Sequence, residues 1–305
     1  MTSAHDTPPP LASLPDTPCY LNGRYSPVSQ AQVSVLDRGF IFGDGVYEVL
    51  PVYDGKIFRF EHHMARLQRS LDELRIARPM PNGEWLAIAR RLIRSHQDGG
   101  GSGNQLVYIQ VTRGVAVRDH VMPAGLTPTL FMMVSDMKLA TAAQREQGVA
   151  CVTADDFRWQ KAHIKSTSLL GAVFSRQISA DAGALETVMF RDGFLSEAAA
   201  SNVWVVKNGQ LLGPPKDHLV LEGIRFSLLE DICREQGIPF ELRRVTRAEV
   251  LDADELLLSS ATKEVLPITT LDGQPVGHGG TRGKPGAVYA KLYAGYQQAK
   301  AAQAI

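Results

Sequence analysis

The chain has 305 residues, of which 44% are hydrophobic and 21% charged, the balance of a folded globular protein with room for two domains. Its 32 Lys and Arg residues equal its 32 Asp and Glu residues, so net charge favours neither nucleic acid nor an anionic membrane surface. No segment approaches the roughly 20 consecutive apolar residues that span a bilayer. The composition therefore indicates small molecules or other folded chains as partners, with no nucleic acid and no membrane.

Residues 1–17 are polar and rich in proline, and we expect them to form a flexible extension. They lack the charged segment and apolar run of a signal peptide. Cys19, Cys151 and Cys233 lie far apart without CxxC spacing, which is typical of reduced thiols in a reducing compartment. The expected location is the cytoplasm.

The segment 18–137 has the pattern of a smaller α/β domain. Asn22-Gly23 and Asp54-Gly55 each suit the positive φ angles of a two-residue hairpin turn. Apolar residues at three- and four-residue spacing predict a helix over 64–74 and a second helix that begins near Asn82. Strands are expected over four further stretches, which are 46–53, 56–60, 106–111 and 129–134.

The pattern weakens over 138–148, which we interpret as an interdomain loop before a larger domain over 149–305. Helices are expected near 169–180, 225–236 and 284–302, the last with Val288, Leu292 and Tyr296 on one face. Strands are expected between the helices, at 150–153, 187–190, 203–206 and 255–258. The whole chain is predicted to be α/β (α+β) in two domains.

Several kinds of active site lack their sequence signature here. The eight histidines form no HExxH motif and no Cys/His cluster, which argues against a metal site. The chain also has no GxSxG elbow and no Walker loop. The glycine run at 99–103 has no following Lys-Ser/Thr pair, and we interpret it as a linker.

Lys165 is the first residue that could carry chemistry. It follows Ile164 and precedes Leu169-Leu170, and apolar surroundings disfavour an ammonium group and free the amine as a nucleophile. Considered alone, Lys165 could equally be a solvated surface lysine.

Glu197 precedes a run of small residues, 198–201, that leads into an expected strand. Small side chains let a flat ligand approach the backbone, and a carboxylate there can keep a pyridine nitrogen protonated. The alternative is an ordinary loop glutamate. Two later segments could offer backbone amides to a phosphate, namely the helix start at Gly223-Ile224 and the turn at 259–262.

Seven segments, in this order, resemble the class IV aminotransferases, which are the fold type IV pyridoxal-phosphate enzymes. This family includes the D-amino-acid and branched-chain aminotransferases, and the similarity spans about residues 18–276. The segments are DRGFIFGDGVYEV (37–49), HHMARL (62–67), VTRGVAVRDH (111–120), RWQKAHIKSTSLLGAV (158–173), LSEAAASNV (195–203), LEGIR (221–225) and SSATKEVLP (259–267).

The resemblance implies the two-domain fold type IV architecture, a homodimer, and pyridoxal 5'-phosphate as cofactor. Lys165 would hold the cofactor as an internal Schiff base and act as catalytic base and acid, while Glu197 would face the pyridine nitrogen. The other cofactor contacts that the resemblance implies are Arg66, Leu221, Ile224, Arg225, Ser260, Ala261 and Thr262.

Within the family the chain is most similar to the D-amino-acid transaminases. That subgroup grips the substrate carboxylate with a Tyr and an Arg-x-His pair, matched here by Tyr47, Arg118 and His120, and Val49 is expected beside the substrate. A guanidinium suits this task because it binds a carboxylate through a bidentate fork. The implied reaction moves the amino group of a D-amino acid such as D-alanine to a 2-oxo acid such as 2-oxoglutarate, with ping-pong kinetics.

Three alternatives remain open at this stage. A branched-chain L-amino-acid aminotransferase and a lyase acting on aminodeoxychorismate belong to the same family, and a non-catalytic vitamin-binding protein is a different class. The Arg118-x-His120 pair argues against the branched-chain activity, and a mere binding protein would need neither the lysine nor the carboxylate-binding residues.

The sequence departs from the family pattern where the phosphate is expected. Arg225 stands where relatives often have Thr, and Ala261 replaces a Thr that usually binds phosphate. Ser260, Thr262 or the Arg225 guanidinium are candidates to compensate for the two missing hydroxyls. Ala199 and Ala200 stand where D-amino-acid transaminases often have Ser, which makes this loop drier.

Overall fold

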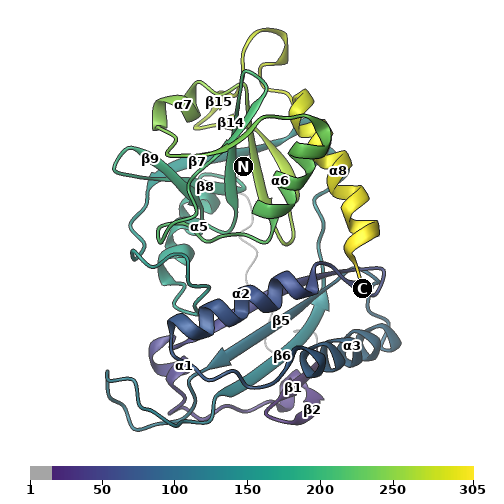
Figure 1. Cartoon of the computed structure of the whole chain (residues 1–305), viewed down its shortest axis with the longest axis vertical. Helices are drawn as coiled ribbons and strands as arrows, with labels where there is room; N and C mark the ends of the chain where they lie inside the picture. The colour runs from purple at the N-terminus through teal and green to yellow at the C-terminus, as the bar shows by residue number, and fades with distance from the viewer. Residues whose placement is uncertain (1–15) are drawn as a thin grey trace, which may run out of the picture.

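The computed structural model describes residues 16–305, so the extension expected over 1–17 lies almost wholly outside the described residues. The chain forms two lobes, each built around a β-sheet (Figure 1). The first sheet ends at Asp136 and the second begins at Val149. We propose the domain boundary in the intervening stretch, 138–148.

The first sheet has six antiparallel strands in the order β2-β1-β6-β5-β3-β4. The strands are β1 (Pro18–Leu21), β2 (Arg24–Pro27), β3 (Gly45–Tyr53), β4 (Lys56–Ile57), β5 (Gln105–Thr112) and β6 (Thr129–Asp136). Buried residues alternate along β5, as expected for a sheet with one face in the core. The strand predicted over 56–60 is shorter than expected, because Phe60 already begins a helix.

Two helices cover this sheet, α2 (Phe60–Glu73) and α3 (Asn82–Asp98). Met64, Leu67 and Leu71 recur at three- and four-residue spacing and are buried on the same apolar core as Trp85. The helices therefore form where the sequence periodicity predicts them. In Figure 1, α2 lies on the side of the first sheet that faces the second lobe.

The second sheet follows the order β12-β11-β10-β13-β14-β7-β8-β9, with β15 paired to β14. It is mixed, since β7 runs parallel to both β8 and β14 while most other pairs are antiparallel. Its strands are β7 (Val149–Asp155), β8 (Glu186–Arg191), β9 (Phe194–Ala198), β10 (Asn202–Lys207), β11 (Gln210–Gly213), β12 (Phe240–Leu242), β13 (Glu255–Ser260), β14 (Glu264–Leu271) and β15 (Gln274–Pro275).

The second lobe also contains three long helices, α5 (Leu170–Asp181), α6 (Arg225–Gln236) and α8 (Ala287–Gln303). Helices α6 and α8 bury their apolar faces in one core, to which Leu229, Ile232, Leu292 and Tyr296 contribute. Shorter elements of the chain are η2 (Val28–Gln30), α1 (Arg38–Phe42), α4 (Ala142–Gln147), α7 (Arg247–Leu251) and η3 (Gly279–Thr281). Across the described chain, none of the helices has the length and apolar character needed to cross a bilayer.

The two lobes are joined by backbone hydrogen bonds as well as by the connecting chain. The Tyr47 N–H of β3 donates to the Lys165 carbonyl at 3.0 Å, and Val46 forms a bridge with Ser166. At the other end, the chain terminus returns to the first lobe, where the Ile57 N–H donates to the Ile305 carbonyl. The segment around Lys165 is thus fixed to β3 although it belongs to the second half of the chain.

Candidate active site

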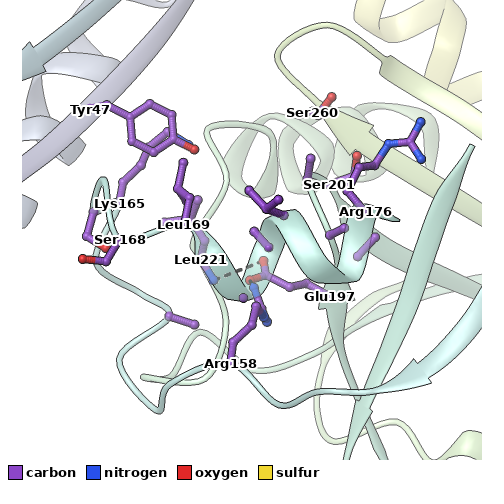
Figure 2. A pocket seen from close by; sticks show the side chains of 18 of the residues that line it. Tyr47, Arg158, Lys165, Ser168, Leu169, Arg176, Glu197, Ser201, Leu221 and Ser260 are labelled. Atoms are coloured by element: carbon purple, nitrogen blue, oxygen red, sulfur yellow. Dashed lines mark hydrogen bonds and ion pairs between the residues drawn. The ribbon is translucent and has the colours of Figure 1, made fainter. Parts of the chain in front are cut away.

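A cavity of about 1290 Å³ lies between the two lobes. It exceeds the roughly 300–1,000 Å³ of most small-molecule sites, so it has room for more than one bound group. Figure 2 shows Tyr47 and Lys165 close together on one side and Ser260 on the other, with Glu197 and Arg158 below. Most of the site residues predicted from the sequence line this cavity, namely Tyr47, Val49, Arg66, Lys165, Glu197, Leu221, Ile224, Arg225, Ser260, Ala261 and Thr262.

The Lys165 backbone is held in place from the first lobe. Its N–H donates to Ser70 Oγ at 3.2 Å, and its side-chain Nζ lies 4.1 Å from the centroid of the Tyr47 ring. The apolar environment expected from the sequence is only partly present, because Leu169 and Leu170 are 40% and 69% exposed. The aromatic face of Tyr47 takes their place beside the amine.

Glu197 lies within strand β9 and not in the loop that the sequence suggested. Its carboxylate is buried and fully engaged: Oε1 accepts from Arg158 Nη1 at 2.5 Å, and Oε2 from Asn202 Nδ2 at 3.2 Å and the Leu221 N–H at 3.3 Å. Burial raises the pKa of Glu197, although the charge of Arg158 opposes that rise. The result is a fixed acid on the cavity wall.

Arg158 is part of a buried ion-pair network that the sequence did not predict. Its guanidinium contacts both oxygens of Asp156, at 2.9 and 2.8 Å, and Arg191 Nη2 reaches Asp156 at 3.1 Å. Burial alone would raise the pKa of Asp156, but the hydrogen bonds from Arg158 outweigh it and hold that pKa below its usual value. The network therefore fixes Arg158 against Glu197.

Arg66 is buried, lines the cavity and forms a bidentate ion pair with Glu48, at 2.7 and 2.8 Å. His63 Nδ1 lies 2.8 Å from the same carboxylate, and Arg66 Nη1 donates to the Glu222 carbonyl at 3.2 Å. Burial lowers the pKa of His63 to about 4, so His63 is neutral at pH 7. Sequence reasoning missed both Glu48 and His63, although each lies within a family-like segment.

The segment before α6 approaches β10 closely. Asn202 Nδ2 donates to the Leu221 carbonyl at 3.0 Å, and a Cβ on Gly223 would lie only 2.1 Å from Asn202 Oδ1. A side chain at 223 would therefore force Asn202 or the backbone of this segment to move. Ile224 and Arg225, at the N-terminus of α6, line the cavity. Backbone N–H groups at a helix start can bind anions because they lack intrahelical partners.

Arg118 and His120 are not among the residues that line the cavity. Both are exposed on the long loop between β5 and β6. Both side chains contact Phe42, a residue that does line the cavity. The centroid of the Phe42 ring is 5.4 Å from Arg118 Cζ and 5.5 Å from the centroid of the His120 ring. The loop is tied to α1, since Arg38 Nη1 donates to the Asp119 carbonyl.

The described residues thus provide an amine, a buried carboxylate, an aromatic ring and a helix N-terminus around one cavity. The profile of the family described as amino-transferase class IV matches residues 45–271. The chain belongs to the class IV aminotransferases, and its architecture is that of fold type IV.

Individual relatives support the same assignment. A D-alanine aminotransferase from Bacillus licheniformis is 39% identical over 260 residues, which cover 85% of this chain and 89% of the relative. A D-alanine aminotransferase from Staphylococcus epidermidis is 33% identical, covering 92% of this chain and 97% of the relative. Among solved structures, a branched-chain aminotransferase from the thermophilic archaeon Thermoproteus uzoniensis, determined with norvaline, superposes with a TM-score of 0.80 at 22% identity, over 92% of this chain and 94% of the other.

The family implies pyridoxal 5'-phosphate as cofactor, and the residues present fit that group. Lys165 offers an amine, Glu197 a buried acid for a ring nitrogen, and the α6 N-terminus amides for a phosphate. The buried Nε of Arg225 has no hydrogen-bond acceptor among residues 16–305, which leaves a donor for an anionic group beside those amides.

Proposed function

We propose that this chain is a D-amino-acid aminotransferase that moves the amino group of a D-alanine-like substrate to a 2-oxo acid such as 2-oxoglutarate. The observation that carries the proposal is that Lys165 and Glu197, 32 positions apart in the sequence, line the same cavity between the lobes. The preference for D-amino acids rests on the two D-alanine aminotransferases to which the chain is 39% and 33% identical.

When bound, pyridoxal 5'-phosphate supplies an aldehyde that captures amines and a ring that withdraws electrons from the substrate α-carbon. Lys165 Nζ holds the cofactor before the substrate arrives. Once free, the same nitrogen would accept the proton from the substrate α-carbon as a base and, as an acid, deliver it to the cofactor carbon that carried the aldehyde. The Tyr47 ring, 4.1 Å from Nζ, limits the directions in which the amine can move.

Glu197 keeps the pyridine nitrogen protonated through its carboxylate. The hydrogen bonds from Arg158, Asn202 and the Leu221 N–H would hold this carboxylate in place for that role. Leu221 would pack on the face of the ring. Arg66 and the amides of Ile224 and Arg225 would bind the phosphate, together with the Ser260–Thr262 turn, which also lines the cavity.

Substrate recognition requires a second copy of the chain in this proposal. Arg118 and His120 lie outside the cavity, on a surface with several exposed apolar side chains, including Phe40, Val117 and Val121. Exposed apolar surface of this kind marks protein–protein contacts. We propose a homodimer in which Arg118 and His120 of one subunit bind the substrate carboxylate in the other subunit's cavity, opposite Tyr47 and Val49.

The compartment that fits this enzyme is the cytoplasm. All three cysteines are buried and none forms a disulfide within residues 16–305, which suits a reducing environment.

A substrate panel with chiral product analysis tests the proposal. D- and L-amino acids are each supplied with 2-oxoglutarate, and the configuration of the glutamate formed is determined. We expect turnover of D-alanine and formation of D-glutamate. Turnover of L-leucine in place of D-alanine would indicate the branched-chain activity, and release of pyruvate from aminodeoxychorismate without an amino acceptor would indicate the lyase.

A further inference from the structure

Two arginines are buried at the junction of the lobes without a carboxylate partner. Arg59 is 4% exposed and Arg225 is 2% exposed, and within residues 16–305 their side chains hydrogen-bond only to hydroxyl and carbonyl oxygens. A buried charge without a counter-ion costs several kcal/mol of folding free energy. The pair therefore calls for an anion.

Arg225 stands at the start of α6 and lines the cavity. Its Nη2 donates to the Tyr296 hydroxyl at 2.9 Å and lies 3.4 Å from the Ala261 carbonyl. Its Nε is buried and has no acceptor in the part of the chain that the structure describes. Both positions at which the sequence departs from the family pattern, 225 and 261, thus meet at one place on the cavity wall.

Arg59, in the first lobe, contacts the same helix, α6. It adopts a left-handed conformation with φ of 55° just before α2, and its Nη2 donates to Ser227 Oγ of α6 at 3.1 Å. Its Nε and Nη1 are buried, and no described residue provides an acceptor for either. Burial lowers the pKa of Arg59, and the nearby charge of Arg225 lowers it further, so the two cations lie close enough to repel each other.

The surrounding charges do not cancel this pair. Arg66 is neutralised by Glu48, His63 is neutral, and Glu264, the carboxylate near Arg225, already binds Arg145 and Lys300. Asp231, whose charge raises the pKa of Arg59, forms its ion pair with Arg234. Within residues 16–305, neither Arg59 nor Arg225 is in an ion pair. A phosphate monoester carries about two negative charges at neutral pH, so its charge matches that of the pair.

We propose that Arg225, supported by Arg59, supplies the hydrogen bonds and charge to the cofactor phosphate that the two threonines of related enzymes would supply. This inference rests on the proposed function, since it concerns the same cofactor. It implies that the phosphate, and not the pyridine ring, is the part of the cofactor that this pair recognises.

The test compares pyridoxal 5'-phosphate with pyridoxal, which lacks the phosphate, in titrations of cofactor-free full-length protein. In Arg225→Gln we expect the dissociation constant of pyridoxal 5'-phosphate to rise about tenfold or more, as for a lost hydrogen bond to a charged group. The dissociation constant of pyridoxal should change less than about twofold. Binding of pyridoxal with unchanged affinity would also show that the variant is folded. Arg225→Lys, which keeps the charge, should lose less affinity.

Arg69→Gln is the matched control, because Arg69 lies on α2 beside Arg66 but is exposed, and it should leave both constants unchanged. Arg59→Gln provides an independent variant, with a smaller loss expected for pyridoxal 5'-phosphate alone. Equal weakening of both ligands, or no weakening of either, in Arg225→Gln would overturn the proposal.

Inorganic phosphate gives a readout that needs no bound cofactor. It should raise the melting temperature of the cofactor-free wild-type protein and of Arg69→Gln, and the rise should be largely lost in Arg225→Gln. An equal rise in Arg225→Gln would contradict the assignment. Failure of transamination with intact phosphate discrimination would instead refute the proposed function and leave this inference standing.

Discussion

Arg158 Nη1 lies 2.5 Å from Glu197 Oε1 on the wall of the cavity, where the Glu197 side chain is buried and the Arg158 side chain is 12% exposed. Because Arg158 is itself held by Asp156, the carboxylate has a fixed orientation and a fixed positive neighbour. Burial raises the pKa of Glu197 against the opposing effect of Arg158. Removing Arg158 should therefore raise that pKa further.

The first prediction concerns the pH profile of Arg158→Gln. Since the mechanism needs the Glu197 carboxylate charged, activity falls as the pH falls through its pKa. We expect the acid side of the kcat profile to move to higher pH in Arg158→Gln and much less in Arg158→Lys. A lower kcat with an unmoved profile would show that Arg158 acts only on structure.

The second prediction concerns stability and His63. Burial holds the pKa of His63 at about 4, against 6.5 unperturbed, so the unfolded chain binds the proton more readily. The contribution of neutral His63 to the free energy of unfolding should be complete above pH 6.5. It should be lost as the pH falls toward 4, which lowers the free energy of unfolding by up to about 3 kcal/mol.

Urea unfolding at several pH values measures this dependence. In His63→Asn the loss of stability between about pH 6.5 and about pH 4 should be much smaller than in the wild type. An unchanged slope in the variant would mean that other groups produce the pH dependence. Glu48 should not interfere in this range, because Arg66 and His63 overcome the effect of burial and hold its pKa far below the usual value.

The third prediction tests whether two subunits share a site. Lys165→Ala and Arg118→Ala should each be almost inactive with D-alanine. In the lysine variant the rate of turnover should fall by a factor of about 10² to 10⁴. If Arg118 serves the partner's cavity, a mixed dimer of the two variants contains one intact site. Co-expression should then restore about a quarter of wild-type activity for random pairing in a two-fold dimer.

If verified mixed dimers recover no activity, either Arg118 and Lys165 act in the site of the same chain or Arg118 does not bind the substrate. Simple amines serve as the control substrate, because they have no carboxylate. Arg118→Ala should raise KM for amino acids far more than for amines.

The fourth prediction concerns Gly223. In Gly223→Ala the new Cβ would lie 2.1 Å from Asn202 Oδ1, so either the Asn202 side chain or the backbone of the 221–224 segment must move. Because Asn202 also binds Glu197, the affinity for pyridoxal 5'-phosphate should fall by about tenfold or more. Unchanged affinity in a cofactor titration would show that the close approach has no role in binding.

Some elements of the fold could be predicted from the sequence and others could not. The hairpin turns, α2, α3 and α8 follow from local patterns, since their turn residues and apolar spacing act within a few positions. Helices α4 and α7 were missed, yet both have visible capping boxes, at Thr141–Gln144 and Thr246–Glu249.

Long-range pairings were out of reach of sequence patterns. Arg158 and Glu197 are 39 positions apart, and Arg66 and Glu48 face each other only because α2 packs on β3. Arg118 and His120 were predicted from a family motif. A motif does not indicate whether a loop residue contributes to the cavity of its own subunit or to that of a partner subunit.

The central claim is that Lys165 is the residue that holds pyridoxal 5'-phosphate. Reduction of the native enzyme with borohydride, followed by mass mapping of its peptides, tests this claim directly, with the nearby exposed Lys161 as an internal control. The account predicts that the pyridoxyl group is found on Lys165, and that Lys165→Ala loses both this modification and the visible absorbance of the bound cofactor. Labelling of Lys161 or another lysine instead, with Lys165 unmodified, would contradict it.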